Sequence, residues 1–144
     1  MAVDTQLSFL DAIYDVLTAN TALKTAMGGT VRLYPVQASP DTEMPYMVHR
    51  LDNSAVDVWP MRQATYVIDI LSDTDNINEI TTIRRLVLGL LDERIVTTTD
   101  IQSARVWLQT DGFVQEIEES VWHYVLQFNV RMYRKGEAAT IIAR

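Results

Sequence analysis

The feature that most constrains the fold is a long alternation of apolar and polar residues towards the C-terminal end. Between Val121 and Tyr133 every second residue is apolar or aromatic, namely Trp122, Tyr124, Leu126, Phe128, Val130 and Met132. Successive side chains of a strand point to opposite faces, so this period predicts one strand with a core-facing side. At about 3.3 Å per residue it would span roughly 40 Å, about twice the usual length. We therefore expect its end to project from a small domain or to pair with another chain, as in an assembly subunit.

The size and composition of the chain fit one globular domain. Its 144 residues include 48% hydrophobic residues, which is enough for a packed core. We expect a single domain over residues 1–135 and a C-terminal tail over 136–144, where no period is visible. No apolar run approaches the ~20 residues of a membrane span. The absence of cysteine excludes disulfides, thiol catalysis and cysteine-ligated zinc, and it fits a reducing compartment.

The charge balance is acidic and disfavours one class of partner. The net charge is -7, from 12 basic and 19 acidic residues. Proteins that bind DNA tightly usually present a basic face, so this excess argues against tight nucleic-acid binding. Simple solubility is the plainer explanation of the charge.

Hydrophobic periods elsewhere predict a mixture of helices and strands. Two main helices are expected, over 7–19 and from about Asn76 to Leu91, with a short helical turn over 22–27 that ends at Gly28-Gly29. Strands are expected at 31–34, 45–51, 62–72, 103–109 and 121–133, and 52–60 is expected to be a turn or flap. The predicted fold class is α+β: a mostly antiparallel sheet of about four to five strands, with the two main helices on one face and a long C-terminal hairpin.

The residues that usually carry catalysis or bind metals are sparse. The only histidines, His49 and His123, could meet in space as a metal site or an acid–base couple, but the alternation favours a surface position for His123. Asp73 and Asp75 begin a calcium-loop pattern that then fails, so helix capping explains them better. No phosphate loop or nucleophile motif is present. We therefore expect no enzyme, no cofactor and no bound metal.

An acidic cluster precedes the long strand. Glu116 and Glu118 alternate, so on a strand they would share one face, as the paired carboxylates of a glycosidase do. A solvated, charged hairpin end explains the cluster more simply, and such charges discourage promiscuous edge pairing.

Two tryptophans fall outside the predicted core. Trp107 lies on the polar side of its strand, and Trp59 lies in the flap. Exposed tryptophans are common interface anchors, although packing against a neighbouring loop of the same chain is an equal alternative for both. The expected interface residues are Trp59, Trp107, Asp111, Glu116, Glu118 and Glu119.

Two short segments carry a family resemblance. The run from Ala22 to Pro35, followed by 44–48, resembles the tail completion, or tail terminator, proteins of tailed bacteriophages. That family shows an N-terminal helix, a leucine-containing turn ending in Gly-Gly, a short strand ending in tyrosine, and a Pro-Tyr-hydrophobic strand. The matching positions are Leu23, Gly28, Gly29, Tyr34, Pro45, Tyr46 and Val48. The resemblance extends over about 7–134 and includes no catalytic motif.

The resemblance implies a structural virion protein. Proteins like these form rings, typically hexameric, at the head-proximal end of the tail. The ring terminates growth of the tail tube, joins the tail to the head connector, and lets DNA pass through its lumen. The implied partners are further copies of the chain, the tail tube protein and the connector protein, with assembly in the host cytoplasm and no specific DNA binding. The alternatives are another head–tail joining or tail-tube protein or, with less support, a small-molecule binding module or enzyme.

Overall fold

The computed structural model describes residues 5–38, 42–58, 60–73, 77–114 and 121–134, with side chains omitted for 53–58. The helices are α1 (Thr5–Thr18), α2 (Thr21–Ala26) and α3 (Asn78–Leu91). The strands are β1 (Leu33–Pro35), β2 (Tyr46–Val58), β3 (Met61–Ser72), β4 (Ile95–Val96), β5 (Ile101–Val114) and β6 (Trp122–Arg134).

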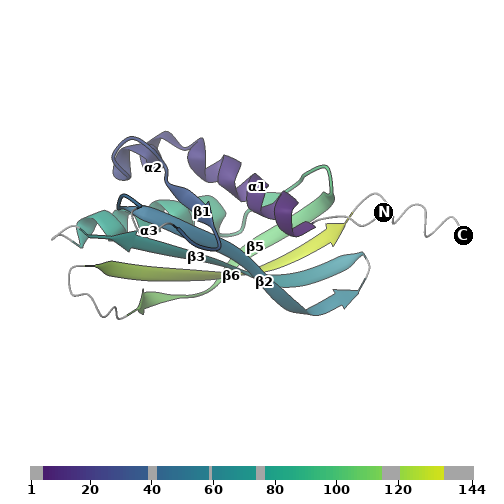
Figure 1. Ribbon diagram of the computed structural model, residues 1–144. Coiled ribbons are helices and arrows are strands. Elements are labelled where there is room, and N and C mark those ends of the chain that lie inside the picture. The colour runs from purple at the N-terminus through teal and green to yellow at the C-terminus, as the bar shows by residue number, and fades with distance from the viewer. Residues whose placement is uncertain (1–4, 39–41, 59, 74–76, 115–120, 135–144) are drawn as a thin grey trace, which may run out of the picture.

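The strands form one curled, mixed sheet. Its order is β1-β2-β3-β6-β5-β4, with β1 parallel to β2 and every other neighbouring pair antiparallel. The three helices pack on one face of this sheet and leave the other face bare in the part of the chain that the structure describes (Figure 1). We call the uncovered side the helix-free face.

Alternation along the strands decides which side chains enter the core. In β6 the even-numbered residues from Tyr124 to Met132 are buried against the helices, as their spacing predicted. The centre of the core is aromatic: the Tyr66 ring lies 5.5 Å from Phe9 and 6.1 Å from Phe128, measured between ring centroids. Burial of these large side chains is the main favourable term in forming such a layer.

The connection from α1 to β1 follows local backbone chemistry. The Asn20 side chain accepts a hydrogen bond of 2.9 Å from the Leu23 backbone N–H, which caps α2. Gly28 and Gly29 have φ values of 85° and 112°, in the region that glycine adopts at little cost. The turn expected at these glycines is confirmed.

The predicted fold class is wrong in three respects. The sheet has six strands rather than four or five and is mixed, because β1 runs parallel to β2. The helices number three rather than two among the described residues, because the short turn expected over 22–27 is a helix in its own right, α2. The β5–β6 pair is not a hairpin attached to a smaller sheet, since β6 also pairs with β3 along its length and lies inside the sheet.

Several departures from the predicted layout have a physical reason. The expected flap after Leu51 is a continuation of β2, because 56–58 pair with the start of β3 despite the poor strand formers Asn53 and Ser54. Strand β4 has only two residues and shows no period of its own. Alternation also says nothing about strand direction, so the parallel pairing of β1 left no signal in the sequence.

The length of β6 does not require a partner chain. Its 13 residues lie beside the 12 residues of β3 and the 14 of β5, from Ser72↔Trp122 at one end to Met61↔Tyr133 at the other. The described part of the β5–β6 pair therefore ends level with β3 and does not project. The expectation that this strand is too long for its own domain is therefore wrong, and its length is no evidence of assembly.

Candidate functional site: the helix-free face

The helix-free face is largely polar where it is formed by β3, β6 and β5. Odd-numbered residues of β3 and β6, and those of β5 from Ser103 to Trp107, point to this side, because their even-numbered neighbours point into the core. Beyond Leu108 an irregularity in the pairing reverses the alternation of β5, so Asp111 lies opposite Leu126 on the helix side. Among the side chains that the structure describes, only Val48 and Val67 are buried hydrophobic residues outside the main core cluster on this face. This face is therefore a surface rather than half of a second core.

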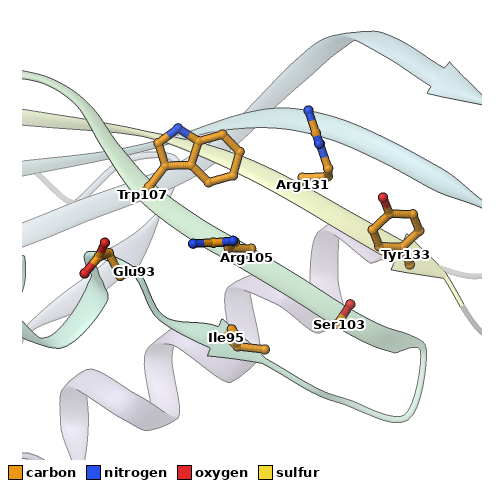
Figure 2. A pocket seen from close by; sticks show the side chains of 7 residues that line it. All are labelled: Glu93, Ile95, Ser103, Arg105, Trp107, Arg131 and Tyr133. Carbon is orange, nitrogen blue, oxygen red and sulfur yellow. The ribbon is translucent and has the colours of Figure 1, made fainter.

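A hollow of ≈ 630 Å³ lies over the β4–β5–β6 side of this face. Figure 2 shows Trp107, Arg105 and Ser103 along β5, Arg131 and Tyr133 on β6, and Ile95 and Glu93 at the β4 edge. Trp107 is half-buried and sits on the polar side of its strand, as the sequence predicted.

Two arginines in this hollow lie side by side on adjacent strands, on the same face of the sheet. Arg105 on β5 is the register partner of Arg131 on β6, and both are exposed. Like charges directly opposite on neighbouring strands repel one another. Within the described residues neither guanidinium forms an ion pair. The hollow thus combines two aromatic side chains with two guanidinium groups that form no ion pair within the described residues.

A second polar group occupies the centre of the same face. His123 Nε2 lies 2.8 Å from an Asp69 carboxylate oxygen, and Arg50 lies 3.4 Å from the other oxygen of that carboxylate. Arg50 also donates to Asp52 at 3.0 Å. These contacts pair the charges locally, so this centre resembles a satisfied surface network more than a reactive site.

The two histidines lie on opposite faces of the sheet and cannot form one site. His49 is on the helix side, 3% exposed, with Nδ1 2.8 Å from the Tyr66 hydroxyl oxygen. Burial lowers the pKa of His49 from 6.5 to about 4 and raises the pKa of Tyr66 well above 10.0. The expected surface position fits His123, which is half-buried, whereas His49 is a core residue.

At the far end of the β5–β6 pair, Asp111 is held by its own chain. It accepts hydrogen bonds from Arg84 Nη2 at 2.5 Å and from the Tyr124 hydroxyl at 3.0 Å. The bond from Arg84 lowers the pKa of Asp111, and burial raises the pKa of Tyr124. Arg84 also lies over the Tyr124 ring, 5.2 Å from its centroid. This contact fastens α3 to the end of the two strands.

The other predicted interface residues lie outside the described part of the chain. These are Trp59, Glu116, Glu118 and Glu119.

The pairing of Arg105 with Arg131 was not predicted from the sequence. Its signal was the placement of Arg105 and Arg131 on the polar sides of two adjacent strands, but their meeting depends on a register that the sequence does not give.

The described residues offer little for metal binding or membrane insertion. No group of three or more His, Asp or Glu side chains among them could hold a metal ion. None of the described helices combines the length and apolar character that crossing a membrane requires.

Comparison with known proteins places the chain among phage tail structural proteins. The chain belongs to the family described as Tail completion protein gp17, whose pattern matches residues 11–133. It is therefore a virion component. One similar solved structure is a chain from "Virion of native gene transfer agent (GTA) particle", with a TM-score of 0.70 at 17% identity over 92% of this chain and 98% of that one. At this identity the likeness shows the fold alone. A search of curated protein sequences gave no significant match.

Proposed function

We propose that copies of this chain form a ring, most simply a hexamer, at the head-proximal end of the tail. The ring stops growth of the tail tube and joins the tail to the head connector, and it carries out no catalysis. The observation that carries this proposal is the family match over residues 11–133. An acidic chain suits a lumen through which DNA slides, because like charge avoids phosphate binding.

The free edges of the sheet support assembly from unlike surfaces. Strand β1 pairs with only 47–49 of β2, and β4 pairs with only 104–105 of β5. The rest of both outer edges has no neighbouring strand among the described residues. Unpaired backbone donors and acceptors are templates for another chain. Because the two edges differ, contact between them would be heterologous, and a heterologous contact closes into a ring when its rotation allows.

The test compares tails assembled with and without this protein. Deletion of its gene should give tubes of uncontrolled length that do not join heads, as measured by electron microscopy, and the purified protein added during tube growth should restore a defined length. Light scattering after size exclusion should show one discrete oligomer, alone or on the tube. Tails of normal length joined to heads without the protein, or a strict monomer in the presence of the tube, would contradict the proposal.

A further inference from the structure

We propose that the hollow around Trp107 binds the acidic segment 115–120 of a second copy of this chain. The inference rests on the proposed ring and names the contact between its neighbouring subunits. The hollow supplies positive charge and aromatic surface, and the segment, Gln-Glu-Ile-Glu-Glu-Ser, supplies carboxylates around one isoleucine.

The hollow contains two guanidinium groups that can bind carboxylates. Arg105 and Arg131 are opposite each other in register, and each lacks an ion-pair partner among the described residues. Glu93 also lines the hollow, but it forms no ion pair with either arginine. A guanidinium binds carboxylates in bidentate geometry, so an incoming acidic segment would relieve the repulsion between the two arginines.

The hollow also presents apolar and aromatic side chains. Ile95 is 66% exposed and Tyr133 is 40% exposed beside the half-buried Trp107. Tryptophan, tyrosine and arginine are the side chains that carry most binding energy in interfaces. This composition suits a polypeptide with an apolar residue between charges better than it suits a free anion.

The segment 115–120 supplies the negative charge. No lysine or arginine lies between Arg105 and Arg131 in the sequence, and that interval holds Asp111, Glu116, Glu118 and Glu119. Within the described residues Asp111 already binds Arg84 and Tyr124. We therefore assign the other three carboxylates of this interval, Glu116, Glu118 and Glu119, to the arginines of a second copy.

Geometry requires that the segment come from another copy. Val114 lies seven positions beyond Trp107 along β5, which is about 23 Å at roughly 3.3 Å per residue. The segment connects the far ends of β5 and β6, and half of its six residues reach only about 10 Å. It cannot return to its own hollow. Each copy would present its hollow to one neighbour and its acidic segment to the other, as a ring requires.

Charge reversal tests the contact. One variant carries Arg105→Glu and Arg131→Glu, and the other carries Glu116→Lys, Glu118→Lys and Glu119→Lys. Each alone should weaken self-association, measured by analytical ultracentrifugation, at least about tenfold, and an equal mixture should restore it because the reversed surfaces then match. The control is Lys24→Glu with Arg85→Glu, which changes the net charge as the first variant does but on exposed helix positions.

A cross-link tests the contact without relying on affinity. The chain has no cysteine, so Trp107→Cys with Ile117→Cys introduces the only thiols. Oxidation should give covalent oligomers, whereas Tyr14→Cys with Ile117→Cys, which uses an exposed position on α1, should not. An absence of 107–117 cross-links, on the tube as well as in solution, would overturn the inference.

The outcomes separate this inference from the proposed function. A ring that survives both charge reversals, or a ring of the Trp107→Cys, Ile117→Cys variant in which the two thiols do not cross-link, leaves the function standing and refutes this contact. Failure of the wild-type chain to assemble on the tube refutes the function itself. Trp107 fluorescence is read in a chain that carries Trp59→Phe and Trp122→Phe, since the protein has three tryptophans. If duplex DNA, rather than a peptide of residues 113–121, protects this fluorescence from quenching, the hollow binds phosphate and the inference is wrong.

Discussion

Replacing His49 with glutamine should change how the stability of the protein depends on pH. His49 is buried beside the Tyr66 hydroxyl, and burial holds its pKa at about 4, below the 6.5 of an exposed imidazole. The unfolded chain therefore binds a proton near pH 6.5 that the folded chain does not bind until about pH 4. The stability contributed by neutral His49 is complete above pH 6.5 and is lost as the pH falls towards 4.

The magnitude follows from the separation of the two pKa values. Each unit is worth about 1.4 kcal/mol, so lowering the pH to about 4.5 should remove roughly 2.5 kcal/mol from the free energy of unfolding. That is a large share of the ~5–15 kcal/mol typical of a domain. Carboxylates titrate over the same range, but they do so equally in the wild type and in His49→Gln.

The assay is urea unfolding of both proteins at pH 7.5 and 4.5, followed by circular dichroism. His49→Gln should be the less stable protein at pH 7.5, because its amide repacks beside Tyr66. The gap should shrink by about 2.5 kcal/mol at pH 4.5 and can reverse its sign. Parallel losses of stability in the two proteins would refute the assignment of a buried, neutral imidazole.

Three further substitutions test individual contacts. Arg84→Gln should lower the free energy of unfolding by about 0.5–1 kcal/mol and speed amide exchange at the far end of β5, because it removes the bond to Asp111. Asn20→Ala should cost about 1 kcal/mol in thermal unfolding, because the Leu23 N–H loses its cap. Trp107→Ala should weaken assembly by roughly 2 kcal/mol while leaving the melting temperature of the isolated monomer nearly unchanged. A clear fall in that melting temperature with unchanged assembly would show that Trp107 packs on its own chain.

The sequence was informative about each strand taken by itself. Alternation assigned the even residues of β6 to the core and Trp107 to the opposite face, and the structure confirms both placements. The helical period likewise placed α1 and α3. These predictions succeed because burial on one side imposes a local period on the chain.

What the sequence could not supply are the relations between strands. The parallel direction of β1 and the pairing of Arg105 with Arg131 are set by tertiary contacts, and no local pattern encodes them. The prediction of a flap at 52–60 was wrong, because Asn53 and Ser54 are poor strand formers and yet β2 continues through them. The family, by contrast, was reached from the resemblance carried by 22–35 and 44–48, which the match over 11–133 confirms.

The double pairing of β6 has a mechanical consequence. The hydrogen bonds of an antiparallel ladder run perpendicular to the strands, and β6 has such a ladder on each side, to β3 and to β5. A pull along its axis loads both ladders in shear, so many bonds must break together before the strand slides. A pull across the sheet would instead open one ladder bond by bond. The subunit should therefore be stiffest along the direction of its longest strands and most easily torn at the short outer strands β1 and β4.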